Sequence, residues 1–122
     1  MALSVLIVDD NESFLDAARA LLQREGVNVV GVATTTAQAL GLAGELRPDV
    51  VLVDINLGKE SGFALARQLD QDEQRSSTSI LMSTYSEADF AELLAESPAV
   101  GFLPKPELSA DAIRRILNGG VH

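Results

Sequence analysis

Two adjacent acids, Asp9 and Asp10, directly follow the apolar run Leu3–Val8 near the start of the sequence. Like charges side by side repel each other, and carboxylates next to a hydrophobic core lose hydration, so a compensating partner is expected. A hard divalent cation such as Mg²⁺, which prefers oxygen ligands and keeps some of its waters, is one such partner. Taken alone, the pair is about as consistent with helix capping as with metal binding.

Three further reactive side chains lie at or just beyond the ends of later apolar runs. Asp54 ends one run, Thr84 ends the next, and Lys105 follows a third, between Pro104 and Pro106. Individually they have ordinary interpretations, as a turn acid, a strand-end cap and a solvated loop lysine. Together with the acid pair they supply carboxylates, a hydroxyl and an ammonium. Acceptance of a phosphoryl group needs such a set: a nucleophilic oxygen, a metal that neutralises charge, and donors for the equatorial oxygens.

The elements of the fold must bring these side chains together. Apolar β-rich runs alternate with segments of helical spacing, which predicts an α/β fold with a parallel sheet and helices on both faces. The expected strands are Leu3–Val8, Val27–Ala33, Asp49–Ile55, Ser79–Thr84 and Ala99–Leu103, and the expected helices are Glu12–Glu25, Ala37–Leu46, Gly62–Leu69, Glu87–Glu96 and Leu108–Leu117. Carboxyl ends of parallel strands gather at one edge, where such sheets bind ligands. We therefore expect one shared site, with Asp54 on the central strand as its nucleophile.

Composition limits the alternatives. The chain has 122 residues, 47% of them hydrophobic, which suits a single domain over 1–122 with a frayed tail at 118–122. It has no cysteine, which excludes disulfides and thiolate metal sites. No apolar stretch approaches the roughly 18 residues of a membrane span, and no signal peptide is visible, so we expect a cytoplasmic location.

Charge and histidine content bear on the partners. The formal net charge is −9 and the only lysines are Lys59 and Lys105, so direct nucleic-acid binding is not expected. The single histidine, His122, stands at the end of the chain, and we assign it no catalytic role. A phosphohistidine donor would therefore have to be another protein.

The motifs, in their order, resemble the receiver domain of two-component response regulators. They read IVDD at 7–10, VLVDIN at 51–56, ILMST at 80–84 and GFLPKP at 101–106, and the resemblance covers nearly the whole chain. It implies a flavodoxin-like, doubly wound five-stranded parallel sheet with strand order 2-1-3-4-5. It also implies a phosphoprotein of the stand-alone chemotaxis-regulator type, although a piece of a longer regulator is equally compatible with the sequence.

The resemblance assigns roles to particular residues. Asp54 would accept the phosphoryl group from a histidine kinase or phosphotransfer protein. The implied Mg²⁺ ligands are Asp9, Asp10, Asp54 and the backbone carbonyl of Asn56. Thr84 and Lys105 would be the family's hydroxyl and lysine, and Phe102 its switch aromatic, although Phe102 could equally be plain core. The Lys105–Pro106 bond would be a candidate cis peptide.

Two positions depart from the family's pattern. Gly58 stands where the family often has proline, which should leave the loop Asn56–Ser61 more flexible. Tyr85 follows Thr84 at a position that is commonly small in the family. A ring there could shield an acyl phosphate from water and slow its hydrolysis, or it could obstruct phosphodonors. We treat Tyr85 as a residue that tunes the reaction, together with Asn56 in the loop after the acceptor.

The expected function is a phosphorylation-activated signalling switch with self-catalysed phosphotransfer and dephosphorylation, rather than a metabolic enzyme. The new charge would draw in Thr84 and pair with Lys105, Phe102 would turn inward, and the face of the fourth helix, fifth strand and fifth helix would change for a downstream partner. That face carries Phe90, Leu93, Leu94 and Phe102. We expect a monomer or weak dimer.

Two other functions compete with this one. A pseudo-receiver would use the fold as a phosphorylation-independent interaction module, which the complete set of Asp54, Thr84 and Lys105 disfavours. A hydrolase of small phosphoesters would need a cap domain and a general acid for the leaving group, and neither is evident in the sequence.

Overall fold

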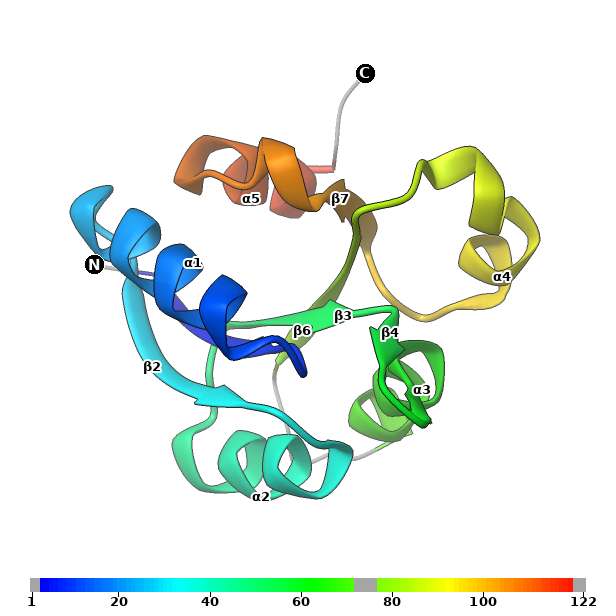
Figure 1. Cartoon of the computed structure of the whole chain (residues 1–122), viewed down its shortest axis with the longest axis horizontal. Helices are drawn as coiled ribbons and strands as arrows, with labels where there is room; N and C mark the ends of the chain where they lie inside the picture. Colours follow the sequence, from blue (N-terminus) through cyan, green and yellow to red (C-terminus); the bar gives the residue numbers. More distant parts are fainter. Residues whose placement is uncertain (1–2, 72–76, 120–122) are drawn as a thin grey trace.

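The computed structural model describes residues 3–71 and 77–119. Its central strands are β1 (Ser4–Val8), β2 (Asn28–Ala33), β3 (Val50–Asp54), β6 (Thr78–Ser83) and β7 (Gly101–Pro104). Its helices are α1 (Glu12–Arg24), α2 (Thr36–Leu46), α3 (Gly62–Gln71), α4 (Ala91–Glu96) and α5 (Ala110–Leu117). The strands form a parallel sheet of order β2-β1-β3-β6-β7 (Figure 1). Without the short hairpin β4–β5 this is the expected order 2-1-3-4-5, so the fold class is confirmed.

The sheet separates two hydrophobic cores. Along β1, Val5 and Ile7 face the core covered by α1 and α5, whereas Leu6 and Val8 face the core covered by α2 and α3. Figure 1 shows these helix pairs on opposite sides of the strands. These four side chains are all 0% exposed. A strand buried on both faces gains from apolar residues at every position, which explains its uninterrupted apolar sequence.

Polar side chains fix where three helices begin. The side chain of Asn11 accepts a hydrogen bond from the Phe14 N–H at the start of α1, and Thr35 and Ser109 cap α2 and α5 in the same way. Such caps satisfy backbone N–H groups that have no partner within the helix. The helix beginnings expected at Ala37 and Leu108 were displaced by one and two residues, because these caps set them at Thr36 and Ala110.

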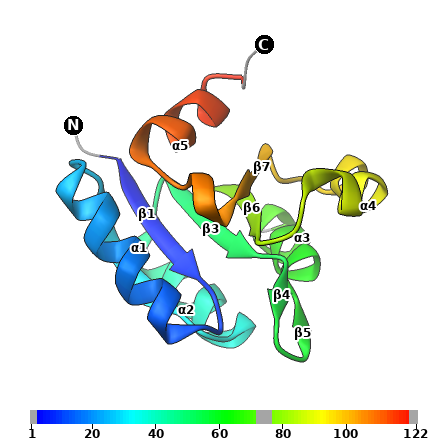
Figure 2. The same ribbon diagram turned by 45° about the horizontal axis from the view of Figure 1, so that its top comes forward.

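The segment after β3 is a hairpin rather than the expected loop. Strand β4 (Asn56–Leu57) pairs with β5 (Glu60–Ser61), and Gly58 at the turn has a φ of +66°. That left-handed conformation suits glycine. The Glu60 carboxylate accepts a hydrogen bond of 2.8 Å from the Thr36 N–H, so the hairpin is tied to the start of α2. Figure 2 shows the hairpin projecting beyond the end of β3. Its flexibility stays a prediction.

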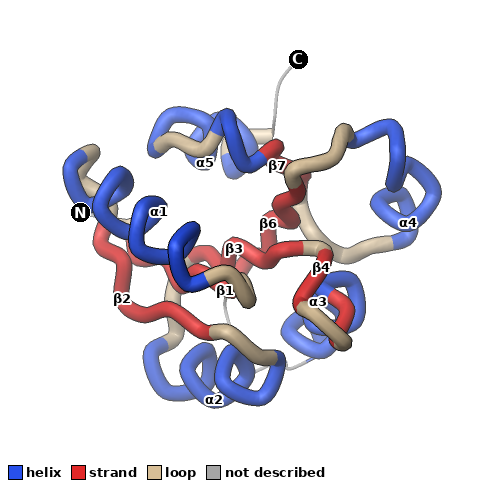
Figure 3. The backbone as a smooth tube through the Cα atoms, viewed as in Figure 1, coloured by secondary structure: helices blue, strands red, loops and turns tan. Residues whose placement is uncertain are grey.

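The fourth helix is shorter than expected. A 3₁₀ turn, Glu87–Phe90, precedes α4, and neither element contains a buried residue. Without a buried face, little tertiary packing favours one continuous α-helix here. The next strand also begins later than Ala99: β7 starts at Gly101, after Val100, which is 52% exposed. The tube in Figure 3 shows the long connections on either side of α4.

Two predictions concern the last part of the chain, a cis Lys105–Pro106 bond and a frayed tail at 118–122. The cis Lys105–Pro106 bond was wrong, since the described residues contain no cis peptide. Pro106 lies within the 3₁₀ turn Lys105–Glu107, and the fixed φ of proline suits the first turn of a helix. Asn118 and Gly119 form a hydrogen-bonded turn after α5, and the remaining residues of the expected frayed tail, 120–122, lie outside the described residues, so the fraying stays a prediction. His122 lies outside the described residues. Within residues 3–71 and 77–119, no helix has the length and apolar character needed to cross a membrane.

Candidate functional site

The acidic residues meet at the carboxyl edge of the sheet. Strands β1 and β3 are neighbours, and the pairing of Val8 with Val53 places the next residues, Asp9 and Asp54, side by side. One carboxylate oxygen from each of Asp9, Asp10 and Asp54 lies within 4.8 Å of the others. The carboxyl ends of neighbouring parallel strands share one edge, which accounts for this proximity. Asp9 and Asp54 are buried, and Asp10 is exposed.

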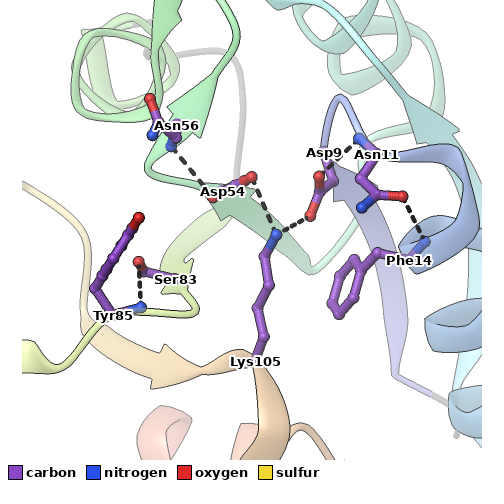
Figure 4. Close-up of polar contacts among 8 residues, drawn as sticks. All are labelled: Asp9, Asn11, Phe14, Asp54, Asn56, Ser83, Tyr85 and Lys105. Atoms are coloured by element: carbon purple, nitrogen blue, oxygen red, sulfur yellow. Dashed lines mark hydrogen bonds and ion pairs between the residues drawn. The ribbon is translucent and has the colours of Figure 1, made fainter.

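Lys105 bridges the two buried acids. Its Nζ lies 2.6 Å from Asp9 Oδ2 and 3.1 Å from Asp54 Oδ2, and its side chain is only 12% exposed (Figure 4). Burial by itself would lower the pKa of Lys105, but the two carboxylates outweigh it and raise that pKa above its ordinary value. The lysine is therefore held as an ammonium at this edge.

The surroundings of Asp54 disfavour its ionised form. Burial, reinforced by the charge of Asp9, raises the pKa of Asp54 to about 6, although the Asn56 N–H and Lys105 act in the opposite direction. The Asn56 N–H donates to Asp54 Oδ1 at 3.2 Å. A buried carboxylate with few compensating donors is poorly solvated, which suits a nucleophile that gains from meeting an electrophile.

Asp9 provides a test of whether a divalent cation fits this site. Its Oδ1 accepts a hydrogen bond of 2.9 Å from the Asn11 N–H. Its Oδ2 is buried and receives no well-aligned hydrogen bond, although the Lys105 ammonium lies close enough for an ion pair. A buried carboxylate oxygen without an aligned donor, facing two other carboxylates, suits Mg²⁺, which takes hard oxygen ligands. The residues present therefore fit the metal.

A cavity of about 330 Å³ opens over this cluster. Its lining residues are Asp9, Asp10, Asn11, Asp54, Asn56, Gly58, Thr84 and Lys105. A water molecule takes up about 30 Å³, so a tetrahedral oxyanion and several waters have room here. Thr84, one residue beyond β6, is exposed and borders the same space. The structure thus brings together Asp9, Asp10, Asp54, Asn56, Thr84 and Lys105.

Two aromatic residues predicted to matter lie outside this cavity. The Tyr85 ring is 61% exposed and meets Phe90 edge-on, with 6.4 Å between the ring centroids. The predicted shielding by Tyr85 stays a prediction, and it would require the ring to leave Phe90. Phe102 is half-buried and packs against the core under α2 and α3. It also lines a second cavity, of about 360 Å³, between α4 and β7.

Sequence reasoning overlooked one participant, Phe14. Its ring centroid lies 4.6 Å from the Lys105 Nζ, at the distance of a cation–π contact. In the sequence, Phe14 is one apolar residue at helical spacing in the expected helix Glu12–Glu25. The available signal was its place in the first turn after the acid pair, which puts it at the same edge of the sheet.

Comparison with known proteins supplies the context of this site. Residues 5–118 match a family model described as the response regulator receiver domain. The polar-differentiation response regulator DivK of Brucella anthropi is 32% identical over 107 residues, covering 87% of this chain and 86% of DivK. The response regulator GacA of Pseudomonas aeruginosa is 32% identical over 96% of this chain, but the chain spans only 56% of GacA.

A solved structure has the same fold. The two-component response regulator of the LuxR family from Aurantimonas sp. SI85-9A1 matches with a TM-score of 0.85 and 27% identity, covering 98% of this chain and 87% of that one. Several relatives are longer than the chain, which spans 58% of another Pseudomonas aeruginosa protein that is 33% identical to it.

Proposed function

This chain belongs to the response regulator receiver domain family, and we propose that it is a signalling switch controlled by phosphorylation of Asp54. The observation that carries the proposal is the convergence of Asp9, Asp10 and Asp54 within 4.8 Å, with Lys105 bridging the two buried acids. Receiver domains are signalling domains and not metabolic enzymes. We also propose that residues 1–122 form one receiver domain.

The proposed reaction is a transfer from a phosphohistidine of a kinase or phosphotransfer protein. An oxygen of the Asp54 carboxylate attacks phosphorus, a P–O bond forms, the P–N bond breaks, and the imidazole leaves as it takes up a proton. Asp9, Asp10 and the Asn56 carbonyl would hold Mg²⁺ together with Asp54. When bound, Mg²⁺ supplies positive charge that offsets the charge of the phosphoryl oxygens.

Lys105 and Thr84 are suited to the product. The Lys105 ammonium already lies 3.1 Å from the acceptor oxygen, so a short movement brings it to a phosphoryl oxygen. Thr84 borders the same cavity and has a hydroxyl that can donate to another oxygen. Both contacts form only with the phosphorylated residue, which is the condition for a ligand to shift a conformational equilibrium.

The output face we propose is built from α4, β7 and α5. Helix α4 has no buried residue, so its displacement costs little packing, and Phe102 lies beside it along the cavity of about 360 Å³. Movement of Thr84 toward a phosphoryl group would pull the connection between β6 and α4, and Phe102 would turn inward. A downstream protein would read the new shape of this face.

Phosphorylation by a small donor tests the proposal. The wild-type protein is incubated with acetyl phosphate and Mg²⁺, and its intact mass is compared with that of Asp54→Asn. We expect the wild type to gain one phosphoryl group, in a Mg²⁺-dependent manner, and the variant to gain none. A wild type that gains no phosphoryl group from acetyl phosphate or from phosphoramidate, and whose spectrum does not change with beryllium fluoride and Mg²⁺, would favour the pseudo-receiver.

A further inference from the structure

The first turn of α1 is linked to the acid cluster by a closed set of contacts. The Asn11 N–H donates to Asp9 Oδ1, and the Asn11 side chain accepts from the Phe14 N–H at 3.1 Å. The Phe14 ring faces the Lys105 ammonium, which in turn contacts Asp9 Oδ2. Figure 4 shows these residues around the lysine. The backbone that fixes Asp9 therefore also fixes the ring beside Lys105.

The ammonium of Lys105 has two carboxylates on one side and an aromatic ring on another. Its Nζ is 2.6 Å from Asp9 and 3.1 Å from Asp54, and the Phe14 centroid is 4.6 Å away. An ammonium has three N–H directions, and the ring supplies an electron-rich face without a competing acceptor atom. The half-buried ring also helps to keep the lysine at its low exposure of 12%.

We propose that Phe14 is a positioning residue for the reaction at Asp54, because its ring holds the Lys105 ammonium between Asp9 and Asp54. This inference rests on the proposed function for its kinetic consequence, but the placement of Lys105 can be tested without phosphorylation. Phe14 touches no reacting atom, and it acts only through the lysine.

A lysine at this edge needs such a support. Its side chain has four rotatable bonds, and the neighbouring carboxylate of Asp10 is exposed and offers an alternative partner. Without the ring, the ammonium could turn toward Asp10 and toward water. Phosphoryl transfer depends on a preorganised positive charge, so it should be slower when the lysine side chain populates several conformations.

The sequence makes the placement of Lys105 directly observable. Lys59 and Lys105 are the only lysines, so protein labelled with ¹³C-lysine gives two sets of ε-methylene signals. An aromatic ring facing Lys105 shifts its ε-proton signal upfield, whereas Lys59 at the exposed hairpin serves as an internal reference. The spectrum is recorded on metal-free, unphosphorylated protein.

Three variants separate the ring from the bulk of the side chain. Phe14→Leu keeps an apolar side chain and improves helix propensity, so a fraying helix cannot explain its effect. Phe14→Tyr keeps the aromatic face. Phe90→Leu is the matched control, since that half-buried ring contacts Phe63 and Tyr85. We expect the upfield shift of Lys105 to disappear in Phe14→Leu and to persist in the other two.

The kinetic consequence is measured with acetyl phosphate. We expect Phe14→Leu to slow phosphorylation of Asp54 by about three- to tenfold, as the strength of a partly desolvated cation–π contact implies, and Phe14→Tyr to restore the rate. An unchanged Lys105 signal in Phe14→Leu, or equal rates in Phe14→Leu and wild type, would overturn the inference. If the wild type is not phosphorylated at all, the proposed function fails, and the Lys105 signal still decides whether Phe14 places the lysine.

Discussion

Gly62 packs directly against the backbone carbonyl of Asp54. A Cβ at Gly62 would overlap that carbonyl oxygen, and the Gly62 N–H donates to the Ile55 carbonyl at 2.8 Å. The start of α3 therefore lies against the residue that we propose as the acceptor. Since the obstructing atoms belong to the backbone of a central strand, they cannot turn aside as a side chain could.

Replacement of Gly62 by alanine should destabilise the protein. The added methyl group must displace α3 or the end of β3, and overpacking of this kind typically costs about 1–3 kcal/mol. Urea unfolding of the metal-free protein measures the change in the free energy of unfolding. We also expect slower phosphorylation, because a displaced β3 moves Asp54 relative to Asp9.

Gly41 offers a matched control for this substitution. It lies inside α2, and a Cβ there would meet nothing within 4 Å. Gly41→Ala should therefore stabilise the protein by up to about 1 kcal/mol, because alanine loses less conformational entropy in a helix than glycine. If both alanine variants changed stability in the same direction, the steric argument at Gly62 would be wrong.

The fold could be predicted because the burial pattern is written plainly in the sequence. Continuous apolar runs such as Val50–Val53 indicate strands covered on both faces, and the helices between them carry apolar residues at helical spacing. The bounds of α4 were harder to predict, because no residue of that helix is buried and no clear apolar periodicity marks where it begins. The hairpin β4–β5 was missed since each strand has two residues, too few for any periodicity.

The raised pKa of Asp54 predicts a particular pH dependence of stability in the absence of metal. That pKa is about 6 in the folded protein against an ordinary 3.8, so the folded state takes up a proton first as the pH falls. The contribution of Asp54 to the free energy of unfolding should therefore increase as the pH falls from about 6 toward 4, and be lost as the pH rises through about 6.

Asp54→Asn isolates this contribution. Urea unfolding of both proteins is measured in EDTA between these pH values, and the difference between them cancels the titration of other carboxylates. The wild type should gain stability relative to Asp54→Asn as the pH falls. A difference that is independent of pH would mean that the pKa of Asp54 is the same in the folded and unfolded protein, and a difference that falls with decreasing pH would mean that folding lowers this pKa; either result would contradict the prediction.

Lys105 and Mg²⁺ should compete for the same oxygens. The ammonium contacts Asp9 Oδ2 and Asp54 Oδ2, and both carboxylates belong to the proposed metal site. In Lys105→Met we expect Mg²⁺ to bind about tenfold more tightly. A neighbouring charge typically shifts the pKa of a carboxylate by about one unit or more, and we expect an effect of the same size on the metal affinity. Calorimetric titration at pH 8, where Asp54 is ionised, measures this affinity. Lys59→Met removes the same charge at an exposed position and should leave the affinity nearly unchanged.

The members of the candidate site were predictable for one physical reason. Parallel strands deliver their carboxyl ends to one edge, so Asp9, Asp54 and Lys105 could be brought together from the positions of the strands alone. What could not be foreseen was contact between side chains within that edge. The bridging position of Lys105 and the ring of Phe14 depend on side-chain rotamers, and the direction of Tyr85 depends on Phe90, which lies in the irregular 3₁₀ turn.

Tyr85 provides the last prediction, which concerns the lifetime of the phosphorylated state. If the ring leaves Phe90 and covers the cavity once Asp54 is phosphorylated, it excludes water from the acyl phosphate and slows hydrolysis. Tyr85→Ala should then shorten the lifetime several-fold, and Tyr85→Phe should preserve it, because the ring and not the hydroxyl provides the cover. Loss of the phosphoryl group is followed by intact mass after removal of the donor. Equal lifetimes in the wild type and Tyr85→Ala would show that the ring stays on Phe90, where the unphosphorylated structure has it.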